Sequence, residues 1–287
     1  MITVLAPAKL NLTLEVLAKR PDGFHEIRSV IQTIKLCDRL DFKPGKKIVV
    51  RCDDAGWLAA ESLVPRAAGL LKETSGYSEG ATIELAKRIP LLSGLAGDSS
   101  DAAALLLGLN RLWGLRYSSG ELARLARQLG SDVAFFLFGG TALVQGRGEV
   151  VSPLPPLPGM WAVLLLPSVP RSAGKTGRLY ASLKPEHYSS GWATEELVAL
   201  LTRGGYVTPD NLFNVFDSIA YDCFDGLDGY RGRFLKAGAG SVHLAGSGPA
   251  LFTLLRDRAQ ADIIYGNLKE QGLEAYLVET MGAISHF

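Results

Sequence analysis

The stretch PLLSGLAGDSSDAAALLLGLNRLWGL, residues 90–115, decides the fold of this 287-residue chain. It opens as a loop whose glycines, Gly94 and Gly97, let backbone N–H groups approach an anion without hindrance from a Cβ atom. Apolar residues at helical spacing follow, and Ser99 or Ser100 is expected to cap that helix. The free N–H groups and positive dipole end of a helix start attract phosphate. The stretch predicts a phosphate-binding loop; a plain loop before a capped helix is the alternative.

The N-terminal segment supplies candidate polar side chains. Residues 9–16 alternate between polar and apolar types, which predicts a strand with one buried face. The apolar face consists of Leu10, Leu12, Leu14 and Val16, and the polar face of Lys9, Asn11, Thr13 and Glu15. Lys9 and Asn11 are therefore expected to project side by side.

Asp132 is the candidate carboxylate. It follows Gly130 and Ser131 and precedes an apolar run, so it is expected at the start of a short helix. A cation and a carboxylate beside a phosphate loop can orient and deprotonate an alcohol. Spacing alone does not bring Lys9 and Asp132 together. An exposed lysine and a helix-capping aspartate are the alternative interpretations.

The remaining pattern predicts an α+β protein. Ser118 and Glu121 form a capping box that opens a helix, and residues 139–151 are typical of a hairpin. The proline-rich residues 153–159 suit a linker, and the segment from there to residue 240 is mostly helical in pattern. GSGPA, residues 246–250, joins two short strands, and a helix and a last strand over 275–279 complete the chain.

Composition excludes several classes of protein. Hydrophobic residues are 47% and charged residues 21%, which excludes intrinsic disorder. Thirty Lys+Arg balance 29 Asp+Glu, so no global basic field holds a nucleic acid or an anionic membrane. The three cysteines are scattered and support neither a disulfide framework nor a thiolate zinc site. The N-terminus lacks a signal-peptide pattern, and the longest apolar run falls short of the ~18 residues of a membrane helix. We expect a cytoplasmic protein.

Two common nucleotide-binding motifs are incomplete in this sequence. GKT occurs at residues 174–176, but a Walker loop needs glycine at position 169, where this chain has Val169. The glycines Gly238 and Gly240 begin a dinucleotide pattern that ends at His243 instead of glycine. By motif, the chain is therefore neither a P-loop nucleoside triphosphatase nor a dinucleotide-binding protein.

Three segments together resemble the motifs of the GHMP kinase superfamily: PAKLNL at 7–12, the loop at 90–100 and GSGPA at 246–250. PDGFHE at 21–26 and GSDVAFF at 130–136 make the chain similar to the branch that phosphorylates an alcohol linked to cytidine diphosphate, in isoprenoid precursor synthesis. The resemblance implies a two-domain α+β fold. Residues 1–155 would form an N-terminal mixed αβ domain and residues 156–287 a C-terminal ferredoxin-like αβ sandwich.

The resemblance also implies roles for individual residues. Lys9 and Asp132 match the active-site lysine and the catalytic aspartate, and Asn11 matches a polar residue near the substrate alcohol. Phe24 and His25 match the pair that holds the cytosine ring, with a core aromatic as the alternative for Phe24. The implied ATP phosphate loop consists of Pro90, Leu91, Leu92, Ser93, Gly94, Leu95, Ala96, Gly97, Asp98, Ser99 and Ser100, supported by the glycine-rich loop of Gly246, Ser247 and Gly248.

The implied ligands are ATP with Mg²⁺ and a small cytidyl substrate, bound by a monomer or weak homodimer with no nucleic-acid or membrane partner. The sequence names no metal ligands. Ala96 and Asp98 replace usual glycines, and the Asp98 charge is expected to weaken phosphate binding unless it faces away or meets Mg²⁺. Ser62 stands where the family has an asparagine near the adenine. A homoserine or mevalonate type kinase and a non-catalytic nucleotide sensor are the alternatives.

Overall fold

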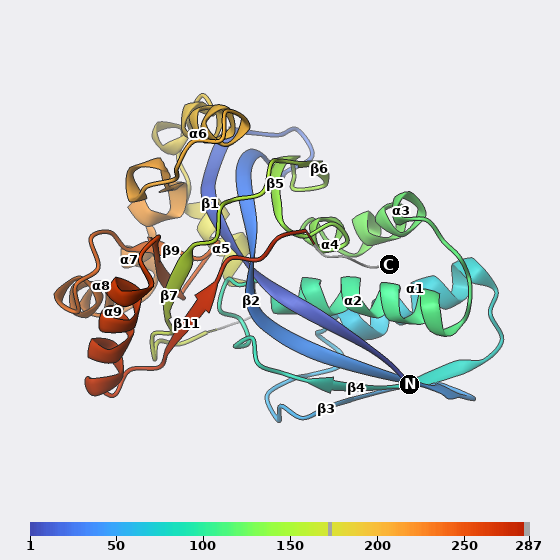
Figure 1. Cartoon of the computed structure of the whole chain (residues 1–287). Helices are drawn as coiled ribbons and strands as arrows, with labels where there is room; N and C mark the ends of the chain where they lie inside the picture. The colour runs from blue at the N-terminus through green and yellow to red at the C-terminus, as the bar shows by residue number, and fades with distance from the viewer. Residues whose placement is uncertain (172–173, 284–287) are drawn as a thin grey trace.

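The computed structural model describes residues 1–171 and 174–283, which form two β-sheets with helices packed against them (Figure 1). The larger sheet contains β1 Ile2–Lys19, β2 His25–Gly45, β3 Ile48–Cys52, β4 Gly80–Ala86, β5 Thr141–Gly146, β6 Val150–Pro153 and β8 Phe213–Asn214. The smaller sheet contains β7 Trp161–Leu165, β9 His243–Leu244, β10 Leu251–Leu255 and β11 Ala275–Glu279.

The helices are mainly short and amphipathic. They are α1 Leu63–Ser75, α2 Gly97–Leu112, α3 Ser119–Leu129, α4 Val133–Phe136, α5 Lys175–Ser182, α6 Trp192–Thr202, α7 Ala220–Cys223, α8 Leu227–Lys236 and α9 Arg258–Glu270. Single 3-10 turns cover Pro185–His187, Pro209–Asn211 and Val215–Ser218. The predicted capping box of Ser118 and Glu121 is present at the start of α3.

The long antiparallel pair β1 and β2 connects the two ends of the molecule (Figure 1). One part of β2 pairs with β4 and the other with β5, and β1 also pairs with β8. The expectation that β1 buries only one face is wrong. Its polar side chains are buried as well, and α6 packs over the part of the strand that carries Thr13 and Glu15. Glu15, fully buried, accepts a hydrogen bond from Thr194 N at 2.8 Å, and Thr13 bonds the Thr194 hydroxyl at 2.9 Å.

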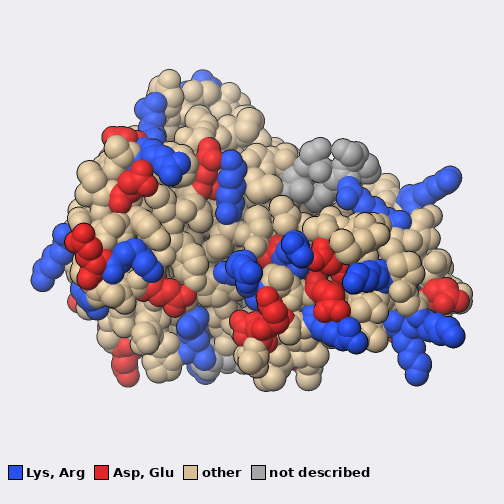
Figure 2. All heavy atoms as spheres, turned by 60° about the horizontal axis from the view of Figure 1, so that its bottom comes forward, with Lys and Arg blue, Asp and Glu red and all other residues tan. Residues whose placement is uncertain are grey.

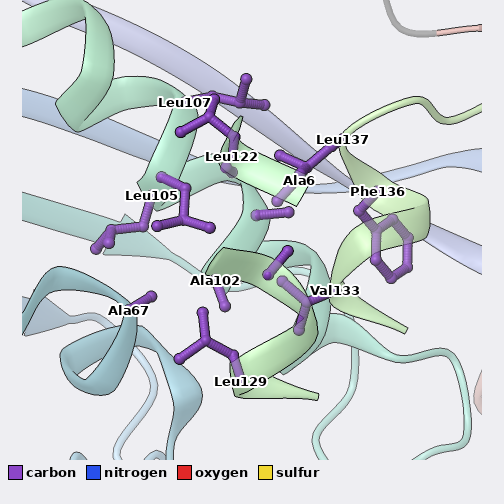
Figure 3. Close-up of a cluster of buried hydrophobic side chains, with 14 of the residues drawn as sticks. Ala6, Ala67, Ala102, Leu105, Leu107, Leu122, Leu129, Val133, Phe136 and Leu137 are labelled. Carbon is purple, nitrogen blue, oxygen red and sulfur yellow. The ribbon is translucent and has the colours of Figure 1, made fainter. Parts of the chain in front are cut away.

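The main core lies where α2 packs on the larger sheet and on α1, α3 and α4 (Figure 3). Every residue of α2 from Ser100 to Leu109 is buried. Three consecutive alanines, Ala102–Ala104, keep this helix narrow on all sides, so that it can touch several elements at once. In this cluster, side chains of α2 lie with side chains of α3 and α4 (Figure 3). They include Ala102, Leu105 and Leu107 of α2, Leu122 and Leu129 of α3, and Val133 of α4. The helix that follows the phosphate loop is therefore fixed from several directions.

The start of α2 differs from the expectation. The helix begins at Gly97, and neither Ser99 nor Ser100 caps it, since both lie inside its first turn. The N-cap residue is Ala96, which has φ 60° and makes no side-chain cap. An alanine in this left-handed region costs roughly 1–2 kcal/mol relative to a glycine. The serine hydroxyls are consequently not used by the helix itself.

The smaller sheet has the order β11-β7-β10-β9, with its strands antiparallel. In chain order this is 4-1-3-2, and α9 packs on β7, β10 and β11 with α8 beside it. The predicted ferredoxin-like αβ sandwich is confirmed. The proline-rich linker lies between β6 and β7. Since β8 joins the larger sheet from the second half of the chain, the boundary at residue 155 stays a prediction.

Charges of both signs are interspersed on the face of the molecule seen in Figure 2, which contains no broad region of one sign. This distribution agrees with the balanced composition and gives no electrostatic surface for a polyanion on that face. In residues 1–171 and 174–283, no helix is long and apolar enough to cross a membrane.

Candidate active site

Lys9 and Asp132 come together, as the chemistry requires. The Lys9 Nζ lies 3.9 Å from an Asp132 carboxylate oxygen, and Lys9 is only 4% exposed. Asp132 precedes α4 without capping it, so its partly exposed carboxylate is available to a ligand. Both alternative interpretations, the exposed lysine and the capping aspartate, are wrong. Burial lowers the pKa of Lys9, and the Asp132 charge partly offsets this effect.

Asn11 orients the lysine. Its side-chain oxygen accepts a hydrogen bond from Lys9 Nζ at 2.6 Å, and its amide donates to Ser29 Oγ at 2.8 Å. Ser29 in turn donates to the Thr13 carbonyl of β1. This chain of bonds across the β1–β2 pair holds the Lys9 ammonium group in one position, beside Asp132.

The phosphate loop and the glycine-rich loop lie against each other beside Lys9. Ser93 O accepts from Ala250 N at 3.0 Å, and Leu95 O accepts from Lys9 N at 3.1 Å. Gly94 has φ 92°, and a Cβ there would lie 2.0 Å from Ala245 O. A Cβ on Gly246 would lie 2.9 Å from Lys9 Nζ. Both positions require glycine, because any side chain would collide with the facing loop.

Side chains hold the glycine-rich loop from behind. Asn214 donates to Gly246 O at 2.8 Å and to Leu244 O at 3.1 Å. The Ser247 hydroxyl forms a hydrogen bond with the Thr176 hydroxyl at 2.8 Å.

A cavity of about 410 Å³ lies at the first residues of the phosphate loop, where Pro90, Leu91 and Leu92 line it. Leu91 O accepts a hydrogen bond from the Arg171 side chain there at 3.1 Å.

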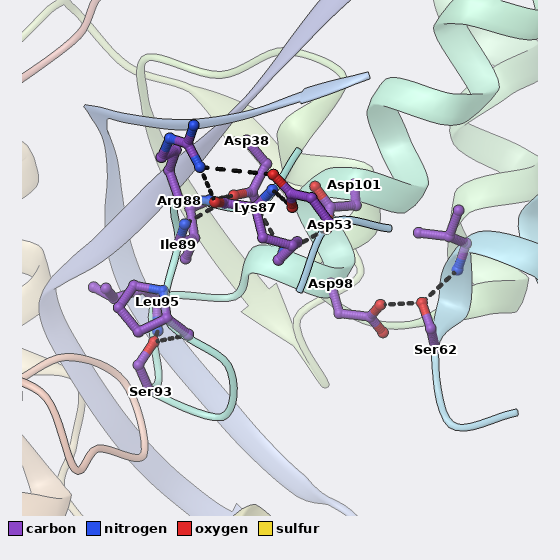
Figure 4. A network of polar contacts seen from close by, with 12 residues as sticks. Asp38, Asp53, Ser62, Lys87, Arg88, Ile89, Ser93, Leu95, Asp98 and Asp101 are labelled. Atoms are coloured by element: carbon purple, nitrogen blue, oxygen red, sulfur yellow. Dashed lines mark hydrogen bonds and ion pairs between the residues drawn. The ribbon is translucent and has the colours of Figure 1, made fainter. Parts of the chain in front are cut away.

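A buried ionic network anchors the phosphate loop at both ends (Figure 4). Lys87, just before the loop, donates to Asp38 of β2 and, at 2.7 Å, to Asp101 of α2. Asp38 also accepts from the backbone N–H groups of Arg88 and Ile89. All three ionisable side chains are almost fully buried. The network joins a strand, the start of the loop and the helix after it, and sequence inspection did not identify it.

Asp98 points away from the middle of the loop, toward α1 (Figure 4). Its carboxylate accepts from the Ser62 hydroxyl at 2.5 Å and from Leu63 N at 2.9 Å. Ser62 is the N-cap of α1 and accepts from Val64 N. The two departures from the family pattern, at positions 62 and 98, therefore contact each other. The Asp98 charge complements the positive end of α1.

The predicted base-binding pair lies near aromatic side chains. Phe24 is 53% exposed, with the Arg147 guanidinium 4.6 Å from its ring centre, so it is not a core residue. His25 stacks on Tyr180 of α5 with ring centres 5.1 Å apart, and Tyr188 meets it edge-on. Burial, with a smaller effect of Lys19, lowers the pKa of His25 and favours a neutral imidazole. Tyr180 was missed because its stretch carried no recognised motif.

No cluster of three or more His, Cys, Asp or Glu side chains that could hold a metal occurs in the part of the chain that the structure describes. The Ser100 hydroxyl, in contrast, is buried at the start of α2 and has no hydrogen-bond partner there. A buried hydroxyl without a partner at a helix start fits a phosphate or a phosphate-bound Mg²⁺. This arrangement fits a Mg²⁺ ion whose ligands come mainly from the phosphates of the nucleotide, with few from protein side chains.

We expect Ser62→Ala and Asp98→Ala each to lower the free energy of unfolding by about 1–2 kcal/mol, since each removes bonds at the start of α1. Because they share one interaction, the double variant should lose about 1 kcal/mol less than the sum of the single losses. Urea unfolding of the four proteins measures this coupling. Strictly additive losses would mean that the Ser62–Asp98 contact contributes nothing to stability.

Comparisons with known proteins agree with this geometry. The GHMP kinases N terminal domain model matches residues 62–140, and the GHMP kinases C terminal model matches residues 197–273. A 4-diphosphocytidyl-2-C-methyl-D-erythritol kinase of Dehalococcoides mccartyi is 49% identical over 284 residues, covering 99% of this chain and 100% of the relative. One of Symbiobacterium thermophilum is 40% identical over 277 residues, covering 96% and 98%.

Solved structures give the same result. A crystal structure of 4-(cytidine 5'-diphospho)-2C-methyl-D-erythritol kinase, 34% identical, has a TM-score of 0.82 and covers 98% of this chain and 100% of its own. A homoserine kinase of Cytophaga hutchinsonii, 21% identical with a TM-score of 0.74, covers 98% and 95% and shares the fold alone. The chain therefore belongs to the 4-diphosphocytidyl-2-C-methyl-D-erythritol kinase family, ATP-dependent small-molecule kinases with the two-domain GHMP kinase fold.

Proposed function

We propose that this protein transfers the γ-phosphoryl group of ATP to the 2-hydroxyl of 4-diphosphocytidyl-2-C-methyl-D-erythritol, a step in non-mevalonate isoprenoid precursor synthesis. The observation that carries the proposal is the meeting of Lys9 and Asp132, 3.9 Å apart, beside two interlocked glycine loops. Family membership at 49% identity supports the substrate.

Asp132 accepts the proton of the attacking hydroxyl. Its carboxylate is 35% exposed, so an alcohol can reach it, and it does not cap α4. Lys9 lies beside it as a fixed cation that orients the carboxylate and offsets negative charge during transfer. Asn11 accepts a hydrogen bond from the ammonium group and thereby keeps Lys9 in this position.

The phosphates of ATP lie at the start of α2. Backbone N–H groups of the loop, the helix dipole and the unpartnered Ser100 hydroxyl converge there. Bound Mg²⁺ would neutralise charge on the phosphates, with Ser100 as the residue best placed to hold it. Asp98 takes no part, because its carboxylate is engaged by Ser62 and Leu63.

Phe24 and His25 select the cytidyl group. An exposed ring and a neutral imidazole provide stacking and hydrogen bonding, the means by which proteins recognise an unpaired base. Homoserine and mevalonate carry no base and would leave these groups unused. A non-catalytic nucleotide sensor would need no Asp132 beside Lys9. We propose a cytoplasmic location and either a monomer or a weak homodimer; the sequence does not decide between these two states.

We expect Asp132→Asn to lower kcat by about 10²–10⁴-fold while leaving the affinity for ATP nearly unchanged, because only the proton acceptor is lost. Asp210→Asn, at an exposed position, is the matched control. Steady-state rates and calorimetric ATP titrations of both variants check this. A purified, folded Asp132→Asn protein with near-normal turnover would remove Asp132 from the catalytic role.

We expect Phe24→Ala to raise KM for the cytidyl substrate by roughly 5–150-fold, equivalent to the ~1–3 kcal/mol of one stacked base, with KM for ATP unchanged. Thermal stability should change little, since the ring is half exposed. Tyr206→Ala is the matched control, because Tyr206 is also exposed and has Arg256 over its ring. Unchanged KM values for both substrates would place the base pocket elsewhere.

A further inference from the structure

The GKT segment at residues 174–176, which forms no Walker loop, lies against the glycine-rich loop instead. Lys175 is the first residue of α5, and its Nζ donates to Gly248 O. The same Nζ lies 3.4 Å from both the carbonyl and the hydroxyl oxygens of Ser247. Lys175 is only 7% exposed. A lysine side chain is therefore buried at the wall of the candidate active site, and the mechanism above does not use it.

The charges around Lys175 are mainly positive. Lys9 of β1 and Arg171, before α5, act on it, and the glycine-rich loop offers only neutral oxygens. Within residues 1–171 and 174–283, Lys175 has no ion-pair partner, while the Asp132 carboxylate is paired with Lys9. Burial, followed by the Lys9 and Arg171 charges, lowers the pKa of Lys175 to about 7. Buried cations without enough carboxylates are typical of a site completed by an anionic ligand.

The two amines lie beside neighbouring residues of the glycine-rich loop. A Cβ on Gly246 would be 2.9 Å from Lys9 Nζ, and Lys175 contacts Ser247 and Gly248 directly. Gly94 of the phosphate loop faces this segment, since its Cβ would lie 2.9 Å from Gly248 N. A phosphate bound beside these loops would therefore be near the fixed Lys9 ammonium and within reach of the flexible Lys175 side chain.

We propose that Lys175 is a second phosphate-binding lysine, whose ammonium group leaves the Gly248 carbonyl to bind a phosphate of the bound ligand together with Lys9. This rests on the proposed function only for the identity of the ligands. The phosphate belongs either to ATP or to the diphosphate of the cytidyl substrate, and both present the same chemistry.

Proton uptake is the direct consequence. Near pH 7, Lys175 of the free protein is about half protonated, and a bound phosphate favours the charged form. At higher pH the free amine is neutral, so binding must take up a proton, and affinity falls by up to about tenfold per pH unit. Lys9, Arg171 and Asp132 face the same space, so variants must separate their effects from that of Lys175.

The test is calorimetry on the full chain at pH 8, where the phosphates of both ligands are already deprotonated. MgATP without acceptor alcohol and cytidine 5'-diphosphate are titrated separately in buffers of different ionisation enthalpy. We expect uptake approaching one proton with the ligand whose phosphate Lys175 binds. Uptake with only one ligand assigns the phosphate to that ligand. The absence of uptake with both ligands, when both bind, would overturn the proposal.

Lys175→Met provides the second measurement, with exposed Lys184→Met as its matched control. The Lys175 variant should abolish the proton uptake and weaken binding of the same ligand by roughly tenfold or more at pH 6.5. Lys184→Met should change neither. Uptake that persists in Lys175→Met would overturn the proposal. Because binding is measured without turnover, a wrong acceptor alcohol in the proposed function would leave the MgATP result interpretable.

Discussion

The active site depends on one buried ionic network, in which Lys87 lies between Asp38 and Asp101. Burying such ions costs on the order of several kcal/mol each, which is offset only by close pairing and further hydrogen bonds. Asp38 has these bonds from the Arg88 and Ile89 N–H groups. Burial, partly offset by the Lys87 charge, raises the pKa of Asp101 well above its usual value. Both ends of the phosphate loop are thereby fixed.

A fixed loop explains how distant segments assemble one site. The loop carbonyls of Ser93 and Leu95 accept bonds from Ala250 and Lys9, so the glycine-rich loop and β1 are positioned against it. The long β1 strand presents Lys9, and α4, packed on α2, presents Asp132. The two loops can lie in contact because Gly94 and Gly246 carry no side chain, and a Cβ at either position would collide with the facing loop. The catalytic pair thus takes its geometry from the packing of α2 and from the network at its first turns.

Local chemistry made much of the fold predictable from the sequence. The capping box at Ser118 and the helix after the phosphate loop are confirmed, because each depends on neighbouring residues. The ferredoxin-like arrangement of the second half, which the family resemblance implied, is confirmed as well. Interactions between distant residues were not predictable. Asp38 lies 49 residues from Lys87 in a strand with several other charged residues, and nothing local marks it as a partner. The buried polar face of β1 was mispredicted because the segments that cover it, α6 among them, lie far along the chain. Tyr180 and Lys175 were missed for the same reason.

The central claim is that the Lys9–Asp132 centre phosphorylates an alcohol that carries a cytidyl group. In the most direct measurement, the purified protein is incubated with MgATP and, in separate reactions, with 4-diphosphocytidyl-2-C-methyl-D-erythritol, homoserine or mevalonate. The rate of ADP release is measured for each alcohol, and ³¹P NMR locates the new phosphate. We expect kcat/KM for the cytidyl alcohol to exceed the other two by more than about 10³-fold, with the phosphate on its 2-hydroxyl. Comparable or faster phosphorylation of homoserine or mevalonate, or no ADP release with the cytidyl alcohol, would contradict the claim.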